Sequence, residues 1–427
     1  MKKIILPLIL CVCPLLNARA AGDEKPVSPK TGWNFGPLPA VGYNTDLGFQ
    51  AGALCDIFYY GDGSEYPDYI HKFNVEASYY TKGSGVFHFF YDSRHLIPKV
   101  RVTAAATYMI NRKYSFYGFN GAASPYFRDM DSNKDTRTAF YNIRRNYLRV
   151  LTDFQGKIGG NWGWAAGLAF KWYDIGDIDL KNYESLNTLY RQYILSGIID
   201  PAEKNGGRHF EIKAGAVYDT RDHEAAPSKG IWGEAYLIGS PDLFSGEYHY
   251  LKFAAHFRHY VPVWRKDRIV FAYHLAYQGT LAGKAPFYVQ QDIATLYLRQ
   301  VNSEGLGSIN TVRGTLYNRM IGDGYAWANI EMRFRIVQFD FIKQHWYVAT
   351  NPFFDLGAVV QPFRLDRMEK LGTGLLYSGS GEKLHMSAGL GVKLVMNNNF
   401  IISVEGAKPL SSQDGPFGMN IGLNYIF

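Results

Sequence analysis

Cysteine is scarce in this sequence, and long apolar runs are missing beyond its first twenty residues. The chain has 427 residues but only three cysteines, Cys11, Cys13 and Cys55. We expect the first two to be removed with an N-terminal signal, which leaves Cys55 without a partner for an internal disulfide. A membrane-spanning helix needs about 20 apolar residues. If the mature chain spans a membrane, it must therefore do so as a closed β-barrel, because an open sheet edge in lipid leaves backbone groups unpaired.

Signatures of common catalytic and nucleotide-binding sites are also missing. The sequence contains no HExxH, GxSxG, P-loop or CxxC motif. Two of its histidines, His256 and His259, would point to opposite faces of one strand and could not share a metal ion. The net charge of +7 comes without a basic cluster. We therefore expect no catalytic residues, no cofactor, no metal and no nucleic-acid partner, with an enzyme site at a barrel rim as the minor alternative.

The first twenty residues have the order of a cleaved export signal. Lys2 and Lys3 precede an apolar run over residues 4–16, and a triplet of small and basic residues at 18–20 follows it. The sequence thus divides into a predicted signal peptide, a short periplasmic segment and a folded barrel domain, at residues 1–20, 21–41 and 42–427.

Aromatic residues and glycine are abundant, whereas charged residues are few. Aromatic residues make up 16% of the chain, charged residues 19%, and there are 44 glycines. Outer-membrane barrels place aromatic residues in two girdles at the membrane interfaces and alternate apolar and polar residues along each strand. Near the C-terminus, one face of such an alternation is wholly apolar, and we expect it to contact lipid: Met419, Ile421, Leu423, Tyr425 and Phe427.

Sixteen segments show strand-like alternation. They cover residues 42–60, 69–81, 85–93, 99–110, 113–119, 139–154, 163–173, 208–219, 230–240, 248–261, 268–280, 325–338, 346–358, 384–396, 400–408 and 418–427. Short gaps, among them 82–84, 111–112 and 397–399, alternate with long ones such as 174–207 and 281–324. Outer-membrane barrels alternate short periplasmic turns with long extracellular loops in this way. We predict an all-β fold, a 16-stranded antiparallel transmembrane β-barrel in the outer membrane, with a short helix in the loop at 174–207.

The longest predicted loop contains the tripeptide Val312-Arg313-Gly314. It resembles the VRG(F/Y) signature of the BamA/TamA (bacterial surface antigen) family, although Thr315 stands where that family has an aromatic residue. In the family this loop folds back into the barrel, and its arginine pairs with acidic residues on strands 12 and 13. The resemblance implies a loop lock in the lumen formed by Arg313, Gly314, Glu331 and Asp355.

Two further motifs fit the same family. Asp219 and Arg221, followed by Pro227 and Gly230, resemble its D-x-R…P-x-x-G periplasmic turn, which we interpret mainly as turn architecture. The C-terminal Tyr425 and Phe427 resemble the signal by which outer-membrane barrels are recognised for assembly.

The resemblance implies a non-enzymatic barrel for protein or lipid insertion or translocation, acting through a weak seam between the first and last strands. Its expected partners are outer-membrane lipids, the barrel assembly machinery for its own insertion, and a periplasmic partner or substrate protein. Residues 21–41 are too few for a periplasmic accessory domain. A passive or loop-gated diffusion channel and a purely structural anchor remain the alternatives.

Overall fold

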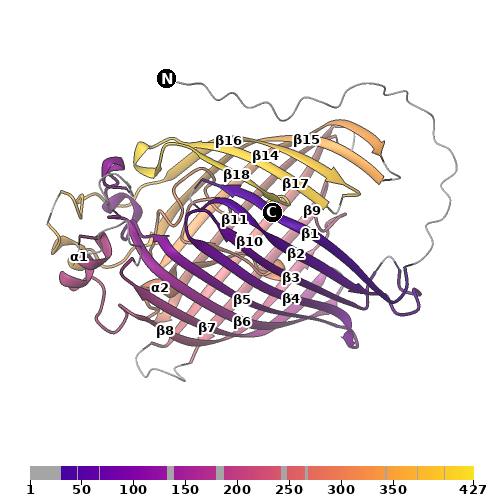
Figure 1. The fold of residues 1–427 in the computed structure, drawn as a ribbon, viewed down its shortest axis with the longest axis horizontal. Helices are drawn as coiled ribbons and strands as arrows, with labels where there is room; N and C mark the ends of the chain where they lie inside the picture. Colours follow the sequence, from indigo (N-terminus) through magenta and orange to yellow (C-terminus); the bar gives the residue numbers. More distant parts are fainter. Residues whose placement is uncertain are drawn as a thin grey trace.

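The structure, a computed structural model, describes residues 30–427 except 46, 67, 132–138, 179–186, 242–247, 265–267, 342–343, 373 and 399. The predicted signal peptide at residues 1–20 lies outside the described residues. The chain forms a closed antiparallel barrel of sixteen strands (Figure 1). The predicted fold class is therefore confirmed.

Each strand of the barrel pairs with its neighbours in chain order, apart from one step at a long insertion. The barrel strands are β1 (Trp33–Asn44), β2 (Gly48–Tyr59), β3 (His71–Tyr80), β4 (Ser84–Ile97), β5 (Val100–Ser115), β6 (Asn142–Gly159), β7 (Trp162–Gly176), β8 (Gly206–Asp219), β9 (Gly230–Ser240), β10 (Tyr250–Trp264), β11 (Ile269–Gly283), β14 (Gly324–Phe341), β15 (Gln344–Gln361), β16 (His385–Met396), β17 (Phe400–Pro409) and β18 (Gly418–Leu423). Strand β11 pairs directly with β14. Between them, β12 (Asp292–Leu296) and β13 (Val301–Glu304) form a separate hairpin.

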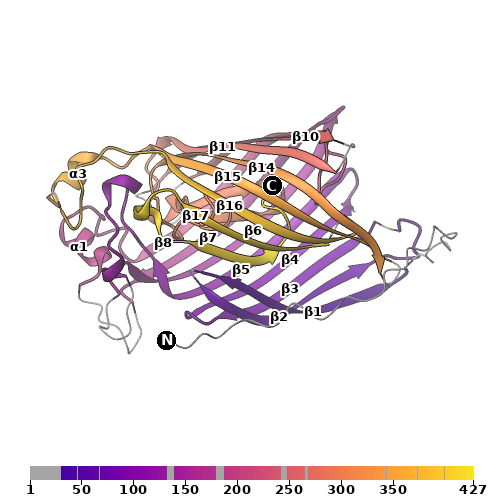
Figure 2. The same cartoon turned by 90° about the horizontal axis from the view of Figure 1, so that it is seen from above.

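Short helices gather at one end of the barrel, which we call the loop end (Figures 1 and 2). They are α1 (Leu189–Leu195), α2 (Phe287–Gln290) and α3 (Leu365–Glu369). Helix α1 lies in the loop where a short helix is predicted, and the Thr188 side chain caps it by accepting a hydrogen bond from the amide of Arg191. Among the described residues, no helix has the length and apolar character needed to cross a membrane.

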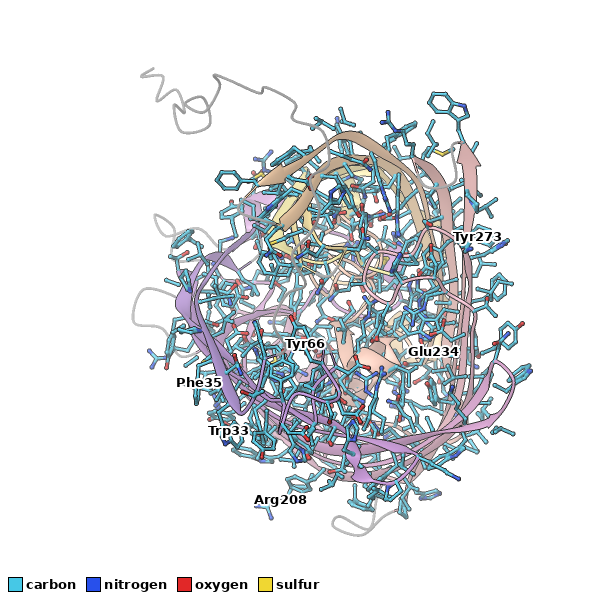
Figure 3. The ribbon with its side chains drawn as sticks, turned by 90° about the vertical axis from the view of Figure 1, so that its right-hand side faces the viewer. Trp33, Phe35, Tyr66, Arg208, Glu234 and Tyr273 are labelled. Carbon is cyan, nitrogen blue, oxygen red and sulfur yellow. The ribbon has the colours of Figure 1, made fainter. Side chains whose placement is uncertain are left out.

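The two faces of the strands differ in the way that the alternation predicts. On β10, Ala254, His256, Arg258 and Tyr260 are buried on the inside, whereas Phe257 is exposed on the outside. Figure 3 looks along the barrel and shows Glu234 inside the ring of strands and Tyr273 outside it. An apolar outer face around a polar interior suits a barrel whose surrounding solvent is lipid.

Three predicted strands are divided differently in the structure. One of them is two strands and the other two are one strand, so the total of sixteen is unchanged. The predicted strand at 42–60 spans two strands, because the chain turns between Asn44 and Gly48, where the Asn44 side chain accepts a hydrogen bond from the amide of Leu47. The separate strands predicted at 99–110 and 113–119 are one strand, β5. The short connection at 82–84 consequently lies at the loop end, and the first barrel strand begins at Trp33 instead of residue 42.

Aromatic side chains from several loops close the loop end. Phe116 packs edge-to-face on the rings of Phe119, of Tyr193 in α1 and of Phe287 in α2, with ring centroids about 6 Å apart. The cluster is buried and extends through the loops that follow β5, β7, β11 and β15; it includes Tyr117, Tyr126, Tyr141, Tyr190, Tyr193, Phe287, Tyr288, Met368 and Tyr377. The loops therefore form a packed cap over the lumen.

Candidate functional site

The segment between β11 and β14, residues 284–323, folds into the lumen and packs against the inner wall of the barrel. Its hairpin of β12 and β13 is attached to the barrel wall by buried ion pairs: Asp292 lies 2.6 Å from Lys171 Nζ, and Glu304 lies 3.0 Å from an Nη atom of Arg145. Because these charges are removed from water, each needs its partner. The hairpin was not predicted from the sequence.

Arg313 lies at the centre of a second cluster of buried charges. Its guanidinium donates to both carboxylate oxygens of Asp355, from Nε at 2.7 Å and from Nη2 at 2.8 Å. Its Nη1 lies 2.6 Å from Glu331 Oε1 and 3.0 Å from Glu405 Oε1. The guanidinium also stacks on the ring of Phe353, 3.4 Å from its centroid. The four residues Arg313, Glu331, Asp355 and Glu405 are called the Arg313 cluster below.

The structure thus brings Arg313 together with both acidic residues that the family resemblance indicates. Glu331 lies on β14 and Asp355 on β15, the twelfth and thirteenth strands of the barrel. Glu405 on β17 is a third carboxylate, which the sequence analysis missed, and Lys393 Nζ balances it at 2.7 Å. The alternation of inward Ser403, Glu405 and Ala407 with outward Ile402 and Val404 could have revealed it.

Gly314 and Thr315 fit the tip of this loop against the end of the barrel sheet. Gly314 has a φ of +83°, and a Cβ atom there would lie 2.6 Å from the carbonyl oxygen of Ala407 on β17. Thr315 is buried, and its hydroxyl donates to the carbonyl of Val312 at 2.7 Å. Where the family packs an aromatic side chain, this chain closes the tip by a hydrogen bond.

The predicted turn motif lies between β8 and β9, at the end of the barrel opposite the loops, which we call the turn end. Arg221 donates to Asp219 from Nε at 2.9 Å and from Nη2 at 2.6 Å. Its guanidinium stacks on buried Trp232, whose ring also lies 4.1 Å from the Arg258 guanidinium. Gly230 has a φ of +105°, and a Cβ atom would meet the carbonyl of Thr220 at 2.3 Å, so glycine is required there.

Residues 220–229 of this turn reach across the mouth of the barrel. On one side, Glu224 lies 3.8 Å from Arg101 of β5. On the other, Ala226 packs with Tyr347 of β15 and with Tyr425 near the C-terminus, and Pro227 is buried beside it. Within the turn, Asp222 accepts hydrogen bonds from the Ser228 side chain and amide. Burial tends to raise the pKa of Asp222, but these hydrogen bonds outweigh it and lower that pKa.

The C-terminal residues fold into the lumen, so the expectation that Tyr425 and Phe427 face lipid is wrong. Strand β18 ends at Leu423, and Asn424 with a φ of +68° turns the chain inward. Tyr425 and Phe427 are then buried against Arg333, whose guanidinium lies 4.1 Å and 5.0 Å from their rings. Arg333 Nη2 also donates to the backbone oxygen of Phe427 at 3.0 Å.

The inward turn leaves a short seam between the first and last strands. Strand β1 pairs with β2 at twelve positions. Among the described residues, β1 pairs with β18 at only two, Tyr43 with Ile421 and Asn44 with Asn420, and Thr45 extends the contact through hydrogen bonds with Met419. The edge of β1 from residue 33 to 42 therefore has no partner strand in the described part of the chain.

The chain is a closed sixteen-stranded barrel with an apolar outer face. A loop is held in its lumen by buried ion pairs, and the seam between its first and last strands is short. These features together are those of one class of outer-membrane barrels. The Omp85 superfamily domain matches residues 71–425 of this chain. The chain belongs to the Omp85 superfamily, which places it in the outer membrane among barrels for insertion and translocation.

Solved structures share this fold at low sequence identity. BamA from Haemophilus ducreyi lacking POTRA domains 1–3 has a TM-score of 0.57 at 14% identity, over 93% of this chain and 71% of that one. CdiB from Escherichia coli has a TM-score of 0.56 at 10% identity, over 93% of this chain and 64% of that one. No curated protein sequence matches the chain.

Proposed function

We propose that this protein is a non-enzymatic barrel of the BamA/TamA type that inserts or translocates protein or lipid through the seam between β1 and β18. The observation that carries the proposal is the contrast between two paired positions at this seam and twelve between β1 and β2. A strand edge with free backbone groups can bind another strand by adding it to the sheet. Opening the seam would therefore disrupt few hydrogen bonds and expose an edge to which a client can bind.

The Arg313 cluster has a positioning role in this proposal. It joins the lumen loop to β14, β15 and β17, the strands that lead to the seam, through Glu331, Asp355 and Glu405. Gly314 touches Ala407 and Gly418, so the loop tip supports the last two strands from inside. This support would keep the barrel closed elsewhere while the seam opens.

A diffusion channel is the alternative, and the close packing around the hairpin and Arg313 argues against it in that part of the lumen. The cavity between the hairpin and the barrel wall, lined by Lys171, Glu211 and Asp292, has a volume of about 40 Å³. A second cavity, beside Arg313 and Gly314, has about 20 Å³. Such volumes hold one or a few water molecules. A larger cavity of about 300 Å³ lies at the loop end beside Thr315, so the close packing is confined to the surroundings of the hairpin and of Arg313. The proposed partners remain outer-membrane lipids, the assembly machinery and a periplasmic partner or substrate protein.

The experiment that separates the two functions uses purified protein in vesicles of phosphatidylethanolamine and phosphatidylglycerol. We expect such vesicles to accelerate the folding of a urea-unfolded outer-membrane barrel client, compared with empty vesicles. In planar bilayers we expect no steady conductance. Steady conductance without faster client folding would contradict the proposal and support the channel.

A further inference from the structure

The edge of β1 that faces β18 lacks two of its backbone hydrogen-bond donors. In an antiparallel strand, alternate residues point their backbone groups to opposite neighbours. The carbonyl of Gly32 accepts from the Tyr60 amide that follows β2, whereas the amide of Thr45 donates to Met419 of β18. The pairing of β1 with β2 has no register shift between Trp33 and Asn44. The even residues of β1 therefore face β2, and the odd residues face the seam.

Two of the odd residues are prolines. Pro37 and Pro39 lie in the middle of β1 and pair in register with Cys55 and Ala53 of β2 without interrupting that ladder. Proline has no N–H, and its ring occupies the space where the hydrogen would be. Both missing donors consequently lie on the seam edge of β1. A partner strand could not bring its carbonyls to hydrogen-bond distance at these positions.

If the register across the seam continued, these prolines would lie opposite the last residues of the chain. Tyr43 pairs with Ile421, so a continued ladder would place Pro39 opposite Tyr425 and Pro37 opposite Phe427. These are the residues that leave the sheet and fold into the lumen. Trp33 and Phe35, labelled at the turn end of β1 in Figure 3, are 55% and 65% exposed.

We propose that Pro37 and Pro39 limit strand addition to the loop-end half of β1. Any strand laid along the seam, the chain's own C-terminus included, finds donors at Val41, Tyr43 and Thr45 and then two missing donors in succession. The seam consequently stays open along residues 33–39, and the last four residues of the chain take their inward position. This inference goes beyond the proposed function, because it concerns the edge itself and holds whichever client uses it.

Other strand prolines follow the same rule. Pro262 of β10 pairs with Val270 at a β-bulge, and the pairing of β10 with β9 has already ended at Tyr260. Pro352 of β15 pairs with Leu390 of β16, at a point where no pair joins it to β14 in the described ladder. Each of these prolines thus coincides with an interruption of the ladder on one side, because proline has no N–H to donate there.

Disulfide formation across the seam tests this proposal on the full chain in vesicles. The reporter pair is Leu38→Cys with Ile426→Cys, which a zipped seam would place opposite each other on one face, in a Cys55→Ser background. All variants also carry Arg333→Gln, which weakens the contacts that keep Tyr425 and Phe427 in the lumen. The variants then differ only in their prolines. A separate set of variants carries Asn44→Cys with Asn420→Cys in place of the reporter pair. Cross-linking of this pair checks that the barrel and its existing seam contact are intact.

With Pro37 and Pro39 present, we expect the reporter pair to cross-link at background level. With Pro37→Ala and Pro39→Ala, the yield should rise several-fold, because the restored donors let the C-terminus pair with β1. Pro262→Ala is the matched control and should leave the yield at background. Equal yields with and without the two prolines, in barrels whose 44/420 control pair cross-links, would overturn the proposal.

Discussion

Asp355 accepts three hydrogen bonds from Arg313, two from the guanidinium at 2.7 and 2.8 Å and one from the backbone amide at 3.0 Å. One carboxylate on the barrel wall therefore fixes both the side chain and the backbone of the lumen loop. Both residues are buried, so neither can exchange its partner for water without the loop moving.

Replacing Arg313 by alanine should destabilise the barrel by about 3–5 kcal/mol, because three carboxylates lose their common buried cation. Urea unfolding in vesicles measures the change, and protease cleavage within residues 284–323 should become faster. Arg128→Ala is the matched control: this arginine is exposed at the loop end, and its loss should change stability by less than about 0.5 kcal/mol. Similar effects of the two substitutions would show that the Arg313 cluster does not hold the loop.

Asp355 and Glu405 should couple to Arg313 to different extents. A double-mutant cycle between Arg313→Ala and Asp355→Asn should give an interaction energy in the upper part of the usual range of about 0.5–3 kcal/mol. The cycle with Glu405→Gln should give less, because Glu405 makes a single contact with Arg313 and keeps Lys393 as a second partner. Additive effects in the Asp355 cycle would contradict the observed geometry.

Gly314→Ala should destabilise the folded loop by about 1–3 kcal/mol, since its φ is left-handed and the added methyl group meets the backbone of Ala407. Gly381→Ala is the comparison, because that glycine is exposed and a Cβ atom there meets nothing within 4 Å. Thermal unfolding followed by gel mobility compares the two. A Gly314→Ala barrel as stable as the Gly381→Ala barrel would show that the loop tip is not pressed against β17.

Asp222 gives the turn across the barrel mouth a dependence on pH. Its pKa is lowered in the folded protein, so its charged form stabilises the turn above the ordinary carboxyl pKa, and this stability is lost as the pH falls through the lowered value. The wild type should exceed Asp222→Asn in stability by about 1 kcal/mol at neutral pH, with the gap closing below about pH 4. An Asp129→Asn control, at an exposed site, should show no such gap. A gap that stays constant with pH would contradict this account.

The sequence predicts the barrel well, and it also predicts which residues of each strand point inward. The reason is that apolar and polar residues alternate with a period of two when one face of a strand contacts lipid. Glu331 and Asp355 could be assigned to the inner face for that reason. The lumen hairpin could not be predicted, since Asp292 and Glu304 find their partners on strands more than a hundred residues away. The inward position of Phe427 depends in the same way on Arg333, which local pattern does not reveal.

The first strand begins earlier than predicted for a physical reason. Pro37 and Pro39 suggest a tether outside the sheet, because proline interrupts a ladder that has neighbours on both sides. At a seam one neighbour is missing, so the prolines are tolerated and β1 extends to Trp33. Aligning the prolines with the C-terminal residues requires the register across the seam, which only the structure supplies.

The most direct test of the central claim, that the seam is where this protein acts, is a reversible tether across it. Asn44→Cys with Asn420→Cys joins paired residues of β1 and β18 in the Cys55→Ser background. The oxidised barrel should stay folded and lose its acceleration of client folding in the vesicles described above, and reduction should restore it. Full acceleration with the disulfide confirmed on gels would contradict the claim.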